Sequence, residues 1–421
     1  MAWIELYVKV ASPAWDDNAN YALNDQVVGS DAKNYFCKLA QDSTKDAQPT
    51  TGADWATYWT VSDGTTAVRA WTFAEMTAAN IATAATSETR VNIKSGAYSQ
   101  GAWTWDAGVA LFPIVYRGYN TTPGDLDQAV RGADGLLVTT NFPVVTCTAP
   151  WAPNTFTFMQ NLVITGALAT AIVSSATVDT YGFVNCSISN TLNDASATCV
   201  LADDYCYFIN CDLSCTGAAH SYLVTAGVSV RVIGCTFKIT LNTQTAVICD
   251  SGTFYQSVFI GKATVGAASK AIDTGIVAVA LIPVTILGCT IYGYETAINV
   301  RNVAQTGMPI LIADNIITDC TNYLVRVAGG NTIVIESNQR TRDNTNPRSA
   351  TIISATLGRE VTTDTGGAES DYVSVTTGNL QLIPSSPARI AGMMPKSDCG
   401  AFQSNLSRTR SRPLRASSKS S

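Results

Sequence analysis

One six-residue pattern recurs along the chain as Phe183-Val-Asn-Cys-Ser-Ile188, Phe208-Ile-Asn-Cys-Asp-Leu213, Val232-Ile-Gly-Cys-Thr-Phe237 and Ile286-Leu-Gly-Cys-Thr-Ile291. Each copy has an apolar residue at both ends, a small or polar third residue, and cysteine in fourth place. Looser copies occupy residues 158–163, 254–259 and 312–317, with a last partial copy around residue 338. A pattern that repeats in this way predicts a solenoid built from similar coils.

The spacing of the repeats identifies the kind of solenoid. Successive copies are 22 to 32 residues apart, and a second short apolar segment follows many copies after 11 to 14 residues. Strands of four to six residues at this step, with turns between them, are typical of one coil of a parallel β-helix. The frame of a leucine-rich repeat and the 3.6-residue period of helical repeats are both missing. The fourth positions are Asn161, Cys186, Cys211, Cys235, Ser257, Cys289, Asn315 and Asn338.

Stacking of the coils gives this fourth position a structural role. Coils of a β-helix lie about 4.8 Å apart, so residues in one register form a column along the axis. We therefore expect the eight residues to form an internal ladder of small side chains at a turn. Asparagine amides can hydrogen-bond along such a column, and cysteine fills the same space as a small apolar group.

The repeats resemble the right-handed parallel β-helix superfamily that includes pectate lyases and phage tailspikes. Residues 382–402 are similar to the closing segment of many β-helix proteins, and residues 91–98 are similar to their opening segment. Thr72-Phe-Ala-Glu75 has the spacing of a capping box and predicts a short capping helix through about Thr83. We expect an all-β chain with a β-helix at 67–403.

The amino-terminal residues 1–66 form a separate small β module in this prediction. They resemble the small chitin-binding module of chitinases, a form that recurs in phage virion proteins, although Asn24 replaces the usual glycine. The resemblance rests on Trp15, Tyr21, Asp25-Gln-Val27, Tyr35-Phe-Cys37, Pro49 and the segment Trp55 to Trp59. It implies that exposed rings stack on sugars, with Tyr35, Trp55 and Trp59 as candidates. The alternative is that these rings form the core of a module with little else to bury.

Composition and charge exclude several classes of protein. Apolar residues make up 46% and charged residues 14% of the 421 residues, which does not fit intrinsic disorder. The longest apolar stretch is too short and interrupted to span a membrane. The tail at 404–421 has five basic residues and no acid, so removing it changes the net charge from −6 to −11. A body this acidic does not suggest a nucleic-acid partner.

The basic tail is a candidate docking arm for a partner protein. Its arginines are Arg408, Arg410, Arg412 and Arg415. A segment rich in serine and arginine is expected to be disordered alone. We therefore expect a partner subunit to hold the tail, while a solvated end remains the alternative.

A search for catalytic and metal sites gives weak candidates. The densest acidic pair is Asp203-Asp204, which is interpreted more simply as turn residues. The single histidine, His220, cannot support a multi-histidine zinc site, and the twelve cysteines do not form CxxC pairs. We therefore expect no catalytic set, metal or cofactor, and buried free thiols. The remaining acids considered as groove residues are Asp212, Asp250, Asp273, Asp314 and Asp319.

These inferences favour a non-enzymatic bacteriophage virion structural protein. We expect a capsid-surface decoration or cement protein that binds other virion proteins, such as the major capsid protein or tail subunits. The amino terminus has no visible secretory signal, so we expect assembly in the host cytoplasm. Host surface glycans are further expected partners, and a homo-oligomer, a trimer by analogy, is expected. The alternatives are a tailspike or tail fibre that binds or depolymerises host polysaccharide, and a cell-surface sugar-binding protein.

Overall fold

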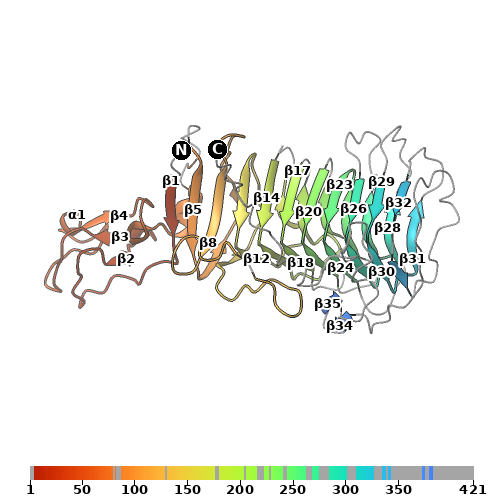
Figure 1. The fold of residues 1–421 in the computed structure, drawn as a ribbon. Coiled ribbons are helices and arrows are strands. Elements are labelled where there is room, and N and C mark those ends of the chain that lie inside the picture. The colour runs from red at the N-terminus through yellow and green to blue at the C-terminus, as the bar shows by residue number, and fades with distance from the viewer. Residues whose placement is uncertain are drawn as a thin grey trace, which may run out of the picture.

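The fold is a stack of short parallel strands that wind into a three-sided solenoid (Figure 1). The computed structural model describes residues 4–78, 81, 87–128, 130–175, 180–202, 205–215, 222–226, 229–239, 244–261, 268–274, 284–300, 310–326, 334–337, 340–342, 372–374 and 379–382. Three sheets of 11, 10 and 9 strands form the sides of the solenoid. Each complete coil contributes one strand to each sheet, and every pairing within the three sheets is parallel. This confirms the predicted parallel β-helix.

The strands have the following bounds. The first sheet contains β1 (Ile4–Val8), β5 (Thr89–Lys94), β8 (Ile114–Tyr119), β11 (Thr157–Gln160), β14 (Thr180–Val184), β17 (Tyr205–Ile209), β20 (Ser229–Ile233), β23 (Gly252–Tyr255), β26 (Val284–Leu287), β29 (Ile310–Ala313) and β32 (Val334–Ser337). The second contains β6 (Ala97–Gln100), β9 (Val144–Cys147), β12 (Val163–Gly166), β15 (Ser187–Asn190), β18 (Asp212–Cys215), β21 (Thr236–Lys238), β24 (Val258–Ile260), β27 (Thr290–Tyr292), β30 (Ile316–Thr318) and β33 (Arg340–Arg342). The third contains β7 (Trp103–Thr104), β10 (Trp151–Ala152), β13 (Ala171–Ser174), β16 (Thr198–Ala202), β19 (Tyr222–Ala226), β22 (Thr245–Cys249), β25 (Lys270–Thr274), β28 (Thr296–Val300) and β31 (Asn322–Arg326).

The core lies between the three sheets and follows the strand register. Met159, Phe183, Phe208 and Val232 pair in sequence across β11, β14, β17 and β20, and all four are fully buried. The rings of Phe183 and Phe208 stack with centroids 5.4 Å apart and an interplanar angle of 11°. Because one register places like side chains above one another, each coil extends the core of the coil before it.

A short helix covers the amino-terminal end of this core. The helix α2 (Phe73–Ala78) starts in the predicted capping box: Glu75 N donates to Thr72 Oγ1 at 3.1 Å, and Thr72 N donates to Glu75 Oε2 at 2.7 Å. Phe73 packs against the rings of Tyr98, Trp103 and Trp151, with centroids 5.4, 5.6 and 6.3 Å away. The structure describes the helix from Phe73 to Ala78, and its predicted end at about Thr83 lies outside the described residues.

The small module follows β1 in the chain and projects from the same end of the solenoid (Figure 1). It contains an antiparallel sheet of β2 (Gln26–Val28), β3 (Asn34–Cys37) and β4 (Trp59–Val61), together with α1 (Trp55–Tyr58). β1 itself pairs in parallel with β5 and therefore lies in the first sheet of the solenoid, although the predicted module began at residue 1. A 3₁₀ turn, η1 (Ala67–Arg69), leads back to the solenoid, and a further antiparallel pair consists of β34 (Tyr372–Ser374) and β35 (Asn379–Leu382).

Candidate functional site

The aromatic residues of the small module form a cluster whose members differ in exposure. Trp59 and Tyr35, both predicted to bind sugar, are only 1% and 4% exposed and lie in the core of the module. Trp55, the third predicted residue, is half-buried and meets Tyr35 edge to face at 5.9 Å. Core packing therefore describes Tyr35 and Trp59, whereas Trp55 keeps part of its surface accessible, as sugar binding would require.

Two further rings extend the accessible part of this cluster. Trp15 and Tyr21 are half-buried and stack on each other with centroids 4.8 Å apart. Both meet the buried Trp59 edge to face, at 5.6 and 5.2 Å, so the core of the module supports the pair from below. We call Trp15, Tyr21 and Trp55, three of the half-buried rings that pack against the core of the module, the aromatic platform. Trp15 and Tyr21 are among the residues on which the resemblance to the chitin-binding module rests. The sequence pattern does not show, however, that their rings stack on each other.

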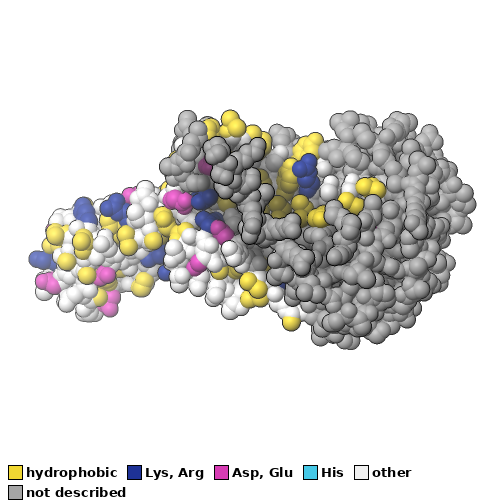
Figure 2. Space-filling view, in the orientation of Figure 1, with side chains coloured by type: hydrophobic (Ala, Val, Ile, Leu, Met, Phe, Trp, Pro, Cys, Tyr) yellow, Lys and Arg dark blue, Asp and Glu magenta, His cyan; other side chains and the backbone are white. Residues whose placement is uncertain are grey.

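Hydrogen bonds hold the Trp15 and Tyr21 rings of the platform in one geometry. Trp15 Nε1 donates to Asp17 Oδ1 at 2.5 Å, and Asp16 N donates to the Tyr21 hydroxyl at 2.8 Å. Burial raises the pKa of Tyr21, so this phenol stays protonated at neutral pH. Preorganised rings with carboxylates beside them can offer apolar contact and hydrogen-bond acceptors to a ligand rich in hydroxyl groups. The face of the module in Figure 2 mixes apolar side chains with charges of both signs.

Asn34 fastens the module to the end of the solenoid. This residue is fully buried, its backbone N–H donates to Glu75 Oε1 at 3.2 Å, and its Nδ2 donates to the carbonyl of Ala70 at 3.3 Å. Ser12 N donates to Asn34 Oδ1 at 3.1 Å. Burial raises the pKa of Glu75, although hydrogen bonds from Thr72 and Asn34 oppose the rise. The same glutamate thus caps α2 and holds the module.

The turns between the first and second sheets contain two adjacent columns rather than one. The outer column has positive φ angles and consists of Asn161, Asn185, Asn210, Gly234, Gln256, Gly288 and Asp314. The inner column follows one residue later and consists of Leu162, Cys186, Cys211, Cys235, Ser257, Cys289 and Asn315.

The register corrects the predicted ladder at Asn161. Because Gln160 pairs with Val184 and Val163 with Ser187, Asn161 aligns with Asn185 and not with Cys186. The physical reason is the positive φ of the outer position, which asparagine and glycine tolerate better than cysteine does. Asn338 lies outside the described residues.

The outer column carries an amide ladder over three coils. Asn185 Nδ2 donates to Asn161 Oδ1 at 3.0 Å, and Asn210 Nδ2 donates to Asn185 Oδ1 at 2.8 Å. Amide-to-amide hydrogen bonding along a column therefore occurs in the outer column, while in the inner column Asn315 Oδ1 accepts from the backbone N–H of Cys289 at 2.7 Å. Such a ladder satisfies side-chain groups that would otherwise be buried without partners.

The inner column satisfies the backbone of the turn. The thiol of Cys235 donates to the Ile233 carbonyl at 3.4 Å, and its sulfur accepts from the N–H of Cys211 at 3.3 Å. Ser257 makes the same two contacts with its hydroxyl, to Tyr255 O at 3.0 Å and from Cys235 N at 3.2 Å. Burial raises the pKa of the Cys235 thiol, which keeps the donor protonated. Cysteine and serine exchange in this column because each is a small donor and acceptor.

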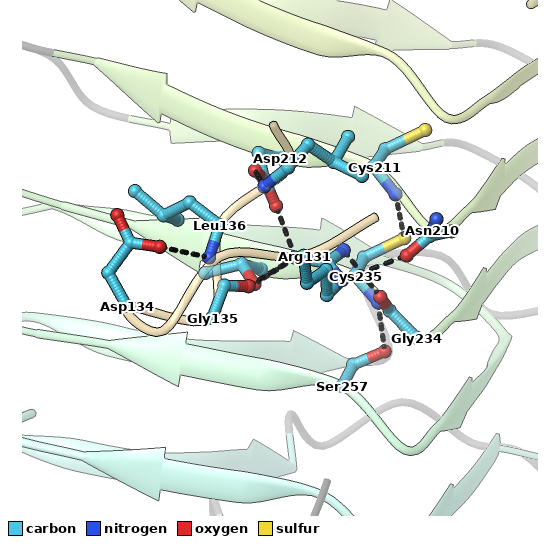
Figure 3. Close-up of polar contacts among 12 residues, drawn as sticks. Arg131, Asp134, Gly135, Leu136, Asn210, Cys211, Asp212, Gly234, Cys235 and Ser257 are labelled. Atoms are coloured by element: carbon cyan, nitrogen blue, oxygen red, sulfur yellow. Dashed lines mark hydrogen bonds and ion pairs between the residues drawn. The ribbon is translucent and has the colours of Figure 1, made fainter. Parts of the chain in front are cut away.

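A loop between β8 and β9, described at residues 120–128 and 130–143, lies along these columns and was not foreseen from the repeats. Figure 3 shows Arg131 of this loop reaching over the turns of successive coils. Its guanidinium donates to Asn210 Oδ1, Asp212 Oδ1 and the Gly234 carbonyl, each at 2.8 Å. Asp127, on the same loop, pairs with Arg117 and accepts from Asn161 Nδ2 at 3.1 Å. The loop therefore binds both ends of the amide ladder.

Asp212 is the most buried acid that this loop contacts. Its side chain is 13% exposed, and its second oxygen accepts from the Leu137 N–H at 2.6 Å. Burial raises the pKa of Asp212, and the charge of Arg131 only partly offsets this rise. Both oxygens are thus occupied by partners from the loop, which is the arrangement of a structural carboxylate.

The remaining acids considered from the sequence do not converge with Asp212. Asp273 binds Lys270 and Asn299 on the third sheet, whereas Asp314 and Asp319 occupy turns with φ angles of 55° and 54°. Asp250 is also buried. Among the described residues no group of histidine, cysteine, aspartate or glutamate could hold a metal ion. Asp203, Asp204, His220 and the tail arginines Arg408, Arg410, Arg412 and Arg415 lie outside the described residues.

The cysteines of the described chain are buried and carry free thiols, as predicted. In the same part of the chain, no helix is long and apolar enough to cross a membrane.

The chain has the parallel β-helix fold. A crystal structure of the pectate lyase Pel9A is similar to 82% of this chain and 94% of that chain, with 14% sequence identity and a TM-score of 0.47. No protein-family model matches the sequence, and no curated protein matches it either.

Proposed function

We propose that this chain is a non-catalytic bacteriophage virion protein that presents a glycan-binding module at the end of a rigid β-helix. The observation that carries this proposal is the aromatic platform at one end of the solenoid, in which the buried Trp59 supports the stacked Trp15 and Tyr21, and the buried Tyr35 supports Trp55. Stacked rings fixed by hydrogen bonds provide a preorganised surface for the apolar faces of sugars. The expected ligands are host surface glycans.

The solenoid suits a structural role in a particle. Each coil contacts its neighbours through backbone ladders, a continuous core and two turn columns, so the stack is a stiff rod. Asn34 and Glu75 attach the module to this rod directly, which would hold the platform away from the surface that bears the protein. Within a virion, we favour a capsid-surface decoration or cement protein that forms a homo-oligomer. The arginines of the tail, 404–421, would bind an acidic surface of another virion protein.

The second candidate function is that of a tailspike that depolymerises host surface polysaccharide. The observation that favours it is the pair Asp203-Asp204, which lies between β16 and β17 in the sequence. Two carboxyl groups are the usual requirement of glycosidases. Degradation of a capsular polysaccharide that Asp203→Ala or Asp204→Ala abolishes would establish this function in place of the non-catalytic one.

Binding to immobilised chitin and to purified host-surface polysaccharides tests the glycan proposal. We expect Trp15→Ala and Trp55→Ala each to weaken binding about tenfold, the equivalent of losing about 1.4 kcal/mol of aromatic contact. Leu39→Ala removes a side chain that is 51% exposed in the same module and serves as the matched control. Equal binding by the two tryptophan variants and the control, or no binding by the unaltered protein, would overturn the glycan proposal.

A further inference from the structure

A lysine, an aspartate and an asparagine lie together on the third sheet, apart from the platform and the turn columns. β25 carries Lys270 and Asp273, and the neighbouring β28 carries Asn299, which pairs in register with Asp273. Asp273 Oδ2 accepts from Lys270 Nζ at 2.9 Å, and Asp273 Oδ1 accepts from Asn299 Nδ2 at 2.8 Å. One carboxylate therefore holds an amine and a carboxamide side by side.

Burial sets Asp273 apart from most of the acids that the structure describes. Asp273 is 0% exposed and Asn299 is 5% exposed, whereas the Lys270 side chain is 27% exposed. Ile248, which precedes Asp273 in the same register, is also buried. Asp273 is a base within hydrogen-bond reach of the Lys270 ammonium, as proton transfer between the two groups requires. A neutral lysine amine is a nucleophile.

We propose that Lys270 and Asn299 become joined by an intramolecular isopeptide bond, with Asp273 as the proton carrier. Asp273 takes one proton from the Lys270 ammonium, and the neutral Nζ attacks the side-chain carbonyl carbon of Asn299. The Nζ–Cγ bond forms, the Cγ–Nδ2 bond breaks, and Asp273 passes its proton to the departing nitrogen while receiving one from Nζ. Ammonia leaves, Asp273 remains protonated, and no oxidant or cofactor takes part.

The geometry favours this reaction over hydrolysis of the amide. The two reacting groups are separated by no more than one carboxylate and its two hydrogen bonds, so a swing of the flexible lysine stem brings them together. Water has little access to a fully buried carboxylate. The product replaces the ion pair on the buried Asp273 carboxylate with neutral groups and links two neighbouring coils covalently.

Mass spectrometry of the purified full-length chain tests the proposal. We expect an intact mass that is lower than the sequence mass by one molecule of ammonia. Trypsin should leave the bond after Lys270 uncut, because the modified lysine is no longer recognised, and should release a branched peptide that contains Lys270 and Asn299. A chain at its full sequence mass, with Lys270 cleaved normally, would overturn the proposal.

Three variants assign the chemistry to these residues. Lys270→Arg should restore the full mass because it removes the nucleophile, and Asp273→Asn should do so because it removes the proton carrier while keeping the size of the side chain. Lys238→Arg alters a lysine on β21 of the second sheet and should leave the mass loss unchanged. Circular dichroism of each variant checks that the solenoid has formed. Mass loss that persists in folded Lys270→Arg would place the reaction elsewhere and contradict the assignment.

Discussion

Arg131 forms an ion pair with the largely buried carboxylate of Asp212, and this contact fixes the β8–β9 loop to the solenoid. Arg131→Met would leave Asp212 without its cation and would remove the donors to Asn210 and Gly234. Breaking such a pair, whose side chains are 16% and 13% exposed, should lower the free energy of unfolding by about 3 kcal/mol. Urea denaturation measures this loss.

The pH dependence of the same variant identifies the cause. Burial raises the pKa of Asp212, so lowering the pH protonates this carboxyl in the folded state before it does so in the unfolded chain. A protonated Asp212 needs no cation, and the loss in Arg131→Met should therefore shrink as the pH falls. Arg231→Met, at an exposed arginine of β20, is the control and should change stability little. A loss that is equal at both ends of the pH range would contradict this account.

Cys235 tests the inner turn column at the residue scale. Cys235→Ala removes the acceptor of the Cys211 N–H and the donor to the Ile233 carbonyl. Leaving a buried N–H without a partner should cost about 1–3 kcal/mol of unfolding free energy. Cys235→Ser keeps a donor and an acceptor, as Ser257 does on the next coil, so its loss should be clearly smaller. Thermal unfolding compares the two variants, and equal losses would show that volume alone decides this position.

The cap of α2 is the element that closes the core at the amino-terminal end. Thr72→Ala removes the hydroxyl that accepts from Glu75 N, and such a cap is worth about 1 kcal/mol. Since α2 positions Phe73 over Trp103 and Trp151, we also expect faster proteolysis at this end of the solenoid. Thr77→Ala alters a threonine later in the same helix and is the matched control. Identical proteolysis of both variants would contradict a sealing role for the cap.

Asp125, in the turn at the start of the β8–β9 loop, should make the stability of the protein depend on pH. Burial alone would raise the pKa of Asp125, but backbone N–H groups of Asn120, Thr121 and Thr122 outweigh it and lower the pKa to about 2. An aspartate with an unfolded pKa of about 3.9 therefore adds stability above that pH and loses it as the pH falls toward about 2. We expect Asp125→Asn to be less stable than the unaltered protein at pH 6 and the difference to have mostly disappeared by pH 2, as measured by denaturant unfolding. A difference as large at pH 2 as at pH 6 would exclude this cause.

At the scale of elements, the sequence predicted the features that recur in each coil or follow a local motif, and it did not predict the loop that belongs to no repeat. Short strands, the capping box and a turn ladder follow from local patterns, and all three occur. The predicted ladder was wrong at Asn161 because the repeat pattern groups residues with similar side chains. In the structure, the φ angle that each turn position requires decides which residue occupies it, and Asn161 has the positive φ of the outer column. Arg131 could not be predicted, since it contacts residues 79 to 105 positions away through a loop that belongs to no repeat.

At the scale of the whole molecule, the aromatic residues show a similar division. Their concentration near the amino terminus predicted a separate module, and the structure contains one. The choice between core and binding surface depended on burial, which separates Trp59 from Trp55 although the two are four residues apart. Side-chain exposure is a property of the packed module and is not encoded in the spacing of its aromatic residues.

The central claim, a virion protein that displays the small module outward, is tested most directly by electron microscopy. Particles from a culture in which the chain is expressed from its own genome would be labelled with an antibody raised against residues 1–66. We predict uniform labelling over the capsid surface. Labelling at the tail tip alone would contradict the decoration role and favour the tailspike alternative, and particles without any label would contradict the virion assignment itself.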